Sequence, residues 1–244
     1  MSTAITPSAH HYGETYFGWQ STIGEFGAWA NLSKFRDFIR SEDNVLDFGC
    51  GGGYLLQALR CRGKLGIEVN ETARQEAASR GVTTFRQAAD VSEEWADLII
   101  SNHALEHTHS PLSELQALYP RLKPGGKIVF VVPSEAISKR YRPNDVNHHL
   151  YTWSPMCLGN LFTEAGFVVE SSLPYIHSWP KHYRRIARLS NRMGGRWLFD
   201  FCCRVQGRLN RTCYQTRIIA YRPGNAAAPI GTAQHVQSKP CRED

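Results

Sequence analysis

The sequence lacks the features of several protein classes. It contains no run of about 18 consecutive apolar residues, and its N-terminus, MSTAITPSAHHYGETYFGWQ, has no cationic start followed by an apolar stretch. Hydrophobic residues make up 42% and charged residues 20% of the 244 positions, which is ordinary globular usage. These absences disfavour a membrane-spanning, secreted or disordered chain, and they predict one folded domain with appendages.

Cysteine is present without a pattern. The seven cysteines are scattered, odd in number and not arranged in CxxC pairs. A disulfide framework requires paired cysteines, and a structural zinc site usually shows CxxC spacing. The sequence therefore predicts neither of these, and its cysteine usage is typical of a protein of the reducing cytoplasm.

What the sequence does contain is an alternation of short β-rich runs with helical patterns, which is typical of βαβ units in a parallel sheet. The predicted strands are 44–48, 64–69, 82–85, 96–101, 127–132, 167–170 and 215–221. Helices are predicted at 54–60, 71–80 and 111–122, and a further helix between Ser154 and Gly166. The KPGG segment that follows residue 122 is predicted to be a turn.

A glycine-rich turn, Asp47 to Gly53, joins the first predicted strand to a helix. Glycine lets a ligand touch bare backbone there, which predicts a nucleotide-like ligand, although a tight turn that merely needs glycine explains the same pattern. Tyr54 occupies the position where a dinucleotide fingerprint needs its third glycine, which disfavours NAD. Glu68, at the end of the next strand, can instead accept hydrogen bonds from the hydroxyls of a ribose.

Four segments in order, VLDFGCGGGYLL, LGIEVN, ADLIISNHALEH and RLKPGGKIVFVVP, resemble the strand motifs of class I S-adenosylmethionine-dependent methyltransferases. The resemblance implies an α/β fold with a Rossmann-like doubly wound seven-stranded sheet, mostly parallel and with an antiparallel last strand. It also implies S-adenosylmethionine as the cofactor. In that family the methionine part would lie near Asp47, Gly49, Gly51 and Gly53, and the ribose near Glu68.

Three further residues are predicted to bind the cofactor. The family usually has an aspartate just after the third strand, near the adenine, and Asp90 is the nearest acid here, although offset. An exposed loop carboxylate or a helix N-cap is the alternative interpretation of Asp90. Asn102 and His103 follow the fourth strand, where ligands of open α/β sheets bind, so we expect their backbone to line the cofactor.

Histidines near the fourth strand raise the question of a metal site. His103 and His107 are spaced to share one helical face, with Glu106 between them and His109 beyond. No thiol or carboxylate cluster joins them apart from Glu106, and the HALEH string resembles a metal-free variant of the superfamily. We therefore expect no bound metal.

The segment NHHLYTWSP resembles the region after the fifth strand in small-molecule methyltransferases, where His149 matches a recurring histidine. Methyl transfer to a hydroxyl requires a base for the proton, and histidine suits that role at neutral pH. His149 is the first predicted catalytic residue and His148 the second. The alternative is that either one only hydrogen-bonds the following helix.

The formal charge of +6 is concentrated in an arginine-rich helical insertion predicted at about 178–212. Arg185, Arg188, Arg192 and Arg196 form a cationic stripe if the stretch is one helix, although the Gly194 and Gly195 pair predicts a break. Such a stripe suits an anionic acceptor or a peripheral contact with an anionic membrane, and a solvated charged face is the alternative. RNA is a further alternative partner. The residues after the fourth strand, SNHALEH, do not include the proline-rich Asn or Asp motif with a following aromatic residue that DNA amino-methyltransferases have, which disfavours a nucleobase as the target.

The chain is expected to have three parts. An aromatic-rich lid segment is predicted at 1–30, the methyltransferase domain at 31–222, and a disordered tail at 223–244. The aromatic residues that define the lid are Tyr12, Tyr16, Phe17 and Trp19, and ordinary core packing of a helix is the alternative.

The expected function is methyl transfer to an oxygen of a small or carrier-linked acceptor. The whole-chain pattern resembles bacterial methyltransferases encoded among polysaccharide-building enzymes, which makes a sugar a plausible acceptor. An NAD-dependent oxidoreductase and a non-catalytic binding protein are the alternatives from other classes.

Overall fold

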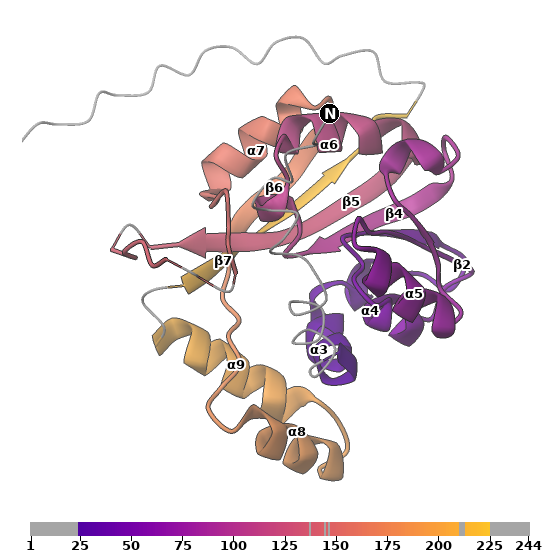
Figure 1. Ribbon diagram of the computed structural model, residues 1–244. Helices are drawn as coiled ribbons and strands as arrows, with labels where there is room; N and C mark the ends of the chain where they lie inside the picture. The colour runs from indigo at the N-terminus through magenta and orange to yellow at the C-terminus, as the bar shows by residue number, and fades with distance from the viewer. Residues whose placement is uncertain (1–23, 137, 144, 146, 210–212, 225–244) are drawn as a thin grey trace, which may run out of the picture.

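The computed structural model describes residues 24–224 apart from positions 137, 144, 146 and 210–212. The predicted lid aromatics and nearly all of the predicted tail lie outside these residues. Seven strands form one sheet in the order β3-β2-β1-β4-β5-β7-β6 (Figure 1). They are β1 (Asn44–Phe48), β2 (Gly63–Ile67), β3 (Thr83–Phe85), β4 (Ala96–Asn102), β5 (Leu122–Glu135), β6 (Val168–Tyr175) and β7 (Cys213–Tyr221).

The direction of the strands confirms the predicted fold class. Strands β1 to β5 pair in parallel, and β7 runs antiparallel to both β5 and β6. Parallel strands need crossover connections, and the helices between them supply these. The carboxyl ends of β1, β2, β4 and β5 therefore meet at one edge of the sheet, where ligands of open α/β folds bind.

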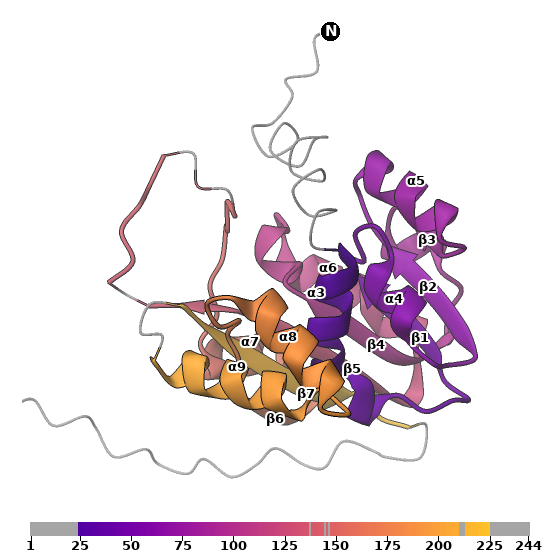
Figure 2. The same cartoon turned by 90° about the horizontal axis from the view of Figure 1, so that it is seen from below.

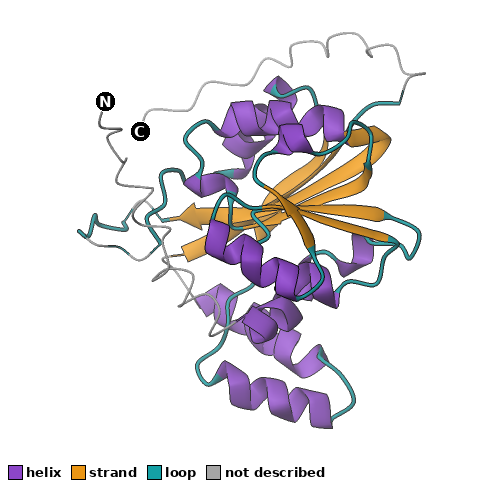
Figure 3. Ribbon diagram, turned by 45° about the vertical axis from the view of Figure 1, so that its right-hand side comes forward, coloured by secondary structure: helices purple, strands orange, loops and turns teal. Residues whose placement is uncertain are grey.

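Helices cover both faces of the sheet (Figure 3). The α-helices of the described residues are α3 (Gly24–Asn31), α4 (Tyr54–Ala58), α5 (Glu71–Ser79), α6 (Pro111–Leu118), α7 (Pro155–Glu164), α8 (Tyr183–Arg192) and α9 (Trp197–Leu209). Side chains of β5 alternate between the two faces: Phe130 packs with Leu115 of α6 and Phe162 of α7, whereas Val129 packs with Leu56 of α4. Each such fully buried apolar side chain stabilises the fold by about 1.5 to 3 kcal/mol.

The predicted start and end of α7 are confirmed. The Ser154 Oγ accepts a hydrogen bond of 3.1 Å from the Cys157 amide, and Pro155 occupies the first turn, where no intrahelical amide bond is lost. Gly166 follows the helix with φ of 98°, a left-handed conformation that glycine adopts without strain.

The predicted turn at KPGG is wrong, because this segment belongs to β5. Leu122 pairs with Ala96 of β4, and the Gly125 amide donates to the Arg222 carbonyl at 2.7 Å. The segment bulges out of the ladder with β4, since Leu98 pairs next with Lys127 and Gly125 has φ of 79°. Local turn chemistry could not reveal its pairing with the chain that leaves β7. The preceding α6 ends at Leu118 rather than 122, and a short 3-10 helix containing Pro120 follows it.

Helices α8 and α9 form a hairpin inserted between β6 and β7, and it extends away from the sheet (Figures 1 and 2). The predicted break is confirmed, since α8 ends at Arg192 and Gly194 has φ of 81°. Arg196 does not continue the cationic stripe. Its guanidinium forms an ion pair with Asp200 and donates to the Trp29 and Ala30 carbonyls, which attaches the hairpin to α3.

None of the helices in the described ranges is long and apolar enough to cross a bilayer.

Candidate functional site

The turn after β1 has the backbone of a ligand-binding loop. Gly49, Gly51 and Gly53 have φ of 74°, 53° and 73°, conformations that side chains disfavour. Gly49 also has no room for a side chain, because an added Cβ would lie 2.2 Å from the Ala104 Cβ. Ala104 follows β4, so the ends of β1 and β4 are in direct contact at this edge.

Glu68 joins this turn from the end of β2. Its carboxylate accepts hydrogen bonds of 2.9 Å from the Gly51 amide and 2.9 Å from the Asn70 amide. Burial raises the pKa of Glu68, and these two amide bonds partly oppose that rise. The structure thus brings together the glycine turn and the acid that the sequence predicted to share one ligand.

Asp47 lies beside them and is 3% exposed. Burial raises its pKa well above the usual value, and the charge of Glu68 adds to this rise. The buried carboxyl of Asp47 and the half-buried carboxylate of Glu68 interact unfavourably when both are charged, so this site favours a ligand that carries positive charge. S-adenosylmethionine carries a sulfonium, an ammonium and a ribose, so the residues present fit this cofactor.

Asp90 lies apart from these residues. It ends a short 3-10 helix after β3, its side chain is exposed, and its carboxylate accepts a hydrogen bond of 3.1 Å from Gln87. Its predicted role at the adenine stays a prediction.

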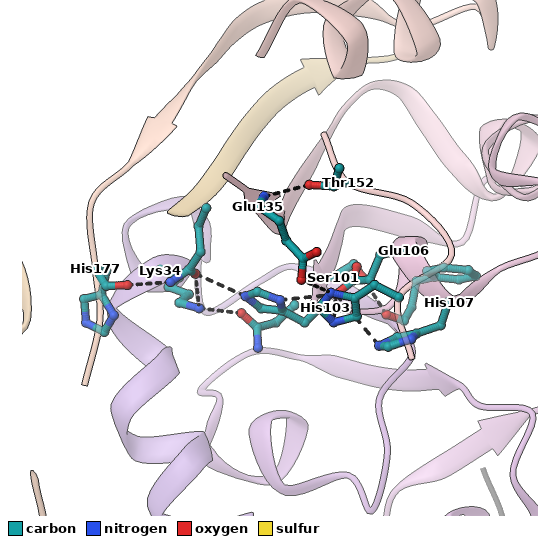
Figure 4. A network of polar contacts seen from close by, with 12 residues as sticks. Lys34, Ser101, His103, Glu106, His107, Glu135, Thr152 and His177 are labelled. Carbon is teal, nitrogen blue, oxygen red and sulfur yellow. Dashed lines mark hydrogen bonds and ion pairs between the residues drawn. The ribbon is translucent and has the colours of Figure 1, made fainter. Parts of the chain in front are cut away.

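Asn102 and His103 contribute side chains to a different group, which also contains a buried lysine (Figure 4). Lys34 is 3% exposed, and its Nζ donates to the Asn102 Oδ1 at 2.7 Å and the Gln215 Oε1 at 2.8 Å. Burial lowers the pKa of Lys34 from 10.5 to about 7, and the charge of Glu106 partly opposes this shift. The His103 Nε2 lies 3.2 Å from the same Gln215 oxygen.

The backbone of His103 is itself unusual. Its φ of 59° is left-handed, and its amide donates to the Val131 carbonyl at 2.9 Å. Such a conformation costs a non-glycine residue on the order of 1 kcal/mol or more and persists where surrounding structure holds it, often at functional sites. His148 shares the feature with φ of 45°.

His149 is held between two carboxylates. Its Nδ1 lies 3.0 Å from the Glu135 Oε1, and its Nε2 lies 3.9 Å from the Glu106 Oε1. Lys139 pairs with the Glu135 carboxylate. The Glu135 amide donates to the Thr152 hydroxyl at 2.7 Å, which holds the backbone at the end of β5 (Figure 4). A histidine whose Nδ1–H is held by a carboxylate keeps its Nε2 lone pair available to accept a proton.

Glu106 connects the two histidine groups. It is fully buried, its Oε1 lies 3.2 Å from the His103 Nδ1, and its Oε2 has no hydrogen-bond partner within the described part of the chain. The donor atoms of Glu106, His107 and His149 lie within 4.8 Å of one another, close enough that the group could hold a metal ion. The expectation of no metal considered Glu106 and His107 without His149, and it stays a prediction.

Three residues of this group were not predicted from the sequence: Lys34, Glu135 and Gln215. Lysine is expected at the surface, so nothing in the sequence singles out Lys34. Glu135 ends β5 and Gln215 lies in β7, two strands that are adjacent only in the folded sheet. The adjacency of β5 and β7 in the class I sheet order is the signal that could have found them.

Comparison with known proteins supports the fold and the cofactor. A family model described as a methyltransferase domain matches residues 23–172. The ubiquinone biosynthesis O-methyltransferase of Pseudomonas savastanoi is 38% identical over 98 residues, covering 35% of this chain and 42% of the relative. That of Vibrio cholerae is 29% identical over 131 residues, covering 46% and 54%. The match thus spans about half of the length of these curated relatives.

Solved structures share the fold. A S-adenosylmethionine-dependent methyltransferase of Archaeoglobus fulgidus superposes with a TM-score of 0.59 at 17% identity, covering 85% of this chain and 99% of that one. Phosphoethanolamine N-methyltransferase 2 of Haemonchus contortus, in complex with S-adenosylmethionine, gives 0.56 at 12% identity, covering 85% and 60%. At these identities the likeness concerns the fold alone. The family model matches more than half of the chain, so the chain belongs to the methyltransferase domain family, and its fold is that of class I S-adenosylmethionine-dependent methyltransferases.

Proposed function

We propose that this methyltransferase transfers the methyl group to an oxygen of a small or carrier-linked acceptor, with a sugar as the first class to test. The observation that supports it is the His149 imidazole, held by Glu135 at 3.0 Å on the edge of the sheet that also carries the glycine turn. A hydroxyl must lose its proton as the methyl group arrives, whereas many amines attack without help from a base.

The proposed roles follow from position. Asp47, the glycine turn and Glu68 hold the cofactor, which supplies a methyl group bound to a sulfonium. His149 accepts the acceptor's proton at Nε2, and Glu135 holds the ring in the tautomer that leaves Nε2 free. His148 is the second choice for the base. Positioning and exclusion of water then account for most of the rate enhancement.

A basic hairpin beside the edge makes an anionic acceptor, such as a phosphate-linked sugar, the favoured class. Exposed arginines of α8 supply the charge, and Arg217 of β7 stacks over the Tyr175 ring at 4.9 Å near the same end of the sheet. The relatives are named for ubiquinone biosynthesis, so a phenolic acceptor is the second class to test.

The test is a methyl-transfer assay with labelled S-adenosylmethionine and three acceptor classes: a sugar nucleotide, a phenol and a primary amine. Transfer to a hydroxyl, located by mass spectrometry and abolished in Glu68→Ala, is the expected result. Transfer to the amine alone would contradict an oxygen acceptor. Cofactor binding with no transfer to any class would support the non-catalytic alternative.

A further inference from the structure

The hairpin of α8 and α9 presents an apolar stripe to solvent. On α9, Trp197, Phe201, Val205 and Leu209 are 57%, 60%, 39% and 70% exposed. They recur every four residues and so share one side of the helix. The opposite side of α9 carries the buried Phe199, Cys203 and Gly207. This stripe is therefore a second apolar face, separate from the one that holds the hairpin together.

The same hairpin carries a large excess of positive charge. The exposed arginines are Arg184, Arg185, Arg188 and Arg192 on α8, and Arg204 and Arg208 on α9. Asp200 is the one acidic residue in the sequence of the hairpin, and its carboxylate is paired with Arg196. By helical spacing, Arg204 and Arg208 lie on the flank of the apolar stripe of α9. Apolar and cationic groups thus occur together on the exposed side of α9, and α8 adds four exposed arginines to the same hairpin.

A cleft of about 260 Å³ lies elsewhere on the hairpin, where α8 meets α3. Its walls are almost entirely apolar, formed by Phe26, Trp29 and Ala187, with the Arg184 and Arg188 side chains at its border. The hairpin extends away from the sheet, as Figure 1 shows. The surface is therefore open to a large, flat partner.

We propose that the α8–α9 hairpin docks on an anionic lipid bilayer. Trp197, Phe201 and Leu209 enter the headgroup region, and the arginines contact lipid phosphates. Interfacial helices combine these features, since aromatic rings favour the interface and each basic residue near it strengthens binding to anionic lipid about fivefold. The inference goes beyond the proposed function and does not depend on methyl transfer.

Two other partners fit the surface less well. A two-fold dimer through this face would bring its six arginines against their own copies, with one paired carboxylate to offset them. RNA would use the arginines and could stack bases on Trp197 and Phe201, but it gives no role to the exposed Val205 and Leu209. Charge and apolar area together thus favour the bilayer.

The test mixes the full chain with vesicles of phosphatidylcholine, with and without phosphatidylglycerol. Sedimentation then separates the vesicle-bound protein from the free protein. We expect binding to the anionic vesicles at least tenfold stronger than to the neutral ones, and a decrease as salt is raised. Trp197→Ser with Phe201→Ser should weaken it at least tenfold, and so should Arg188→Glu with Arg192→Glu. Met156→Ser, an exposed residue of α7, and Arg60→Glu are the matched controls and should bind as the parent does.

Each variant is first checked for unchanged S-adenosylmethionine affinity and thermal unfolding, which shows that the fold is intact. The proposal is overturned by equal binding to neutral and anionic vesicles, or by no vesicle binding. It is also overturned if the hairpin variants bind like the controls. A chain that dimerises through this face or binds RNA while ignoring vesicles would assign the surface to another partner.

Discussion

The two halves of the edge that carries the site are built in different ways. The proposed cofactor half, Asp47 to Gly53 with Glu68, comes from one short stretch of chain across two adjacent strands. The proposed acceptor half takes Lys34, Glu106, Glu135, His149 and Gln215 from five separate segments. Site residues that are close in the sequence can be predicted from a motif. Site residues that the fold brings together can be predicted only when it is known which strands become neighbours.

The strongest test of this comparison is on the cofactor half. Glu68→Ala should weaken S-adenosylmethionine binding about thirtyfold to a thousandfold, because about 2 to 4 kcal/mol of charge-assisted hydrogen bonding is lost. Calorimetric titration measures it. Glu68→Gln, which keeps an oxygen for the Gly51 amide, should lose less. Unchanged affinity in a folded Glu68→Ala protein would mean that the ribose assignment is wrong.

A substitution in the proposed acceptor half should change the turnover rate and leave the cofactor affinity unchanged. His149→Ala should lower turnover about a hundredfold while leaving cofactor affinity intact, because the acceptor's proton then has no base. Single-turnover rates with the identified acceptor provide the measurement. His109→Ala removes an exposed imidazole nearby and is the matched control. Normal turnover in His149→Ala would remove it from the catalytic residues and leave His148 to be tested.

The buried Lys34 should make the free energy of unfolding depend on pH. Its pKa is 10.5 in the unfolded chain and about 7 in the folded protein, so between these values the unfolded state holds the extra proton. Stability then rises with pH in this window, by about 2 kcal/mol from pH 7 to pH 9. Below pH 7 the lysine is charged in both states and its burial is unfavourable. Urea unfolding of the parent and Lys34→Met should show this rise in the difference between them, and parallel curves would refute it.

The smallest effect is expected from metal removal. The sequence predicts that no metal is needed, so dialysis against a chelator should leave turnover and cofactor affinity unchanged. The group of Glu106, His107 and His149 makes the experiment worthwhile. Lost turnover that Zn²⁺ or Mn²⁺ restores would give the acceptor half a cation and change the role of His149 from base to ligand.

The difference between the two halves explains which parts of the fold and of the site could be predicted from the sequence. The range of β1 is confirmed residue for residue, and the contact of Glu68 with the glycine turn follows from two adjacent parallel strands. The extension of β5 through KPGG could not be predicted, because residues after β7 pair with it. The buried position of Lys34 could not be predicted either, because its partners Asn102 and Gln215 are 68 and 181 residues away in the sequence.

The bond between Lys34 and Gln215 has a consequence for how the protein matures. As the chain leaves the ribosome, β1 to β5 can pair and build the glycine turn while β7 is still unsynthesised. Until β7 inserts between β5 and β6, Lys34 lacks the Gln215 oxygen and the sheet has an unpaired edge at β5. A nascent chain would thus form the glycine turn before the group around Lys34, and β7, the last strand of the described residues, completes that group.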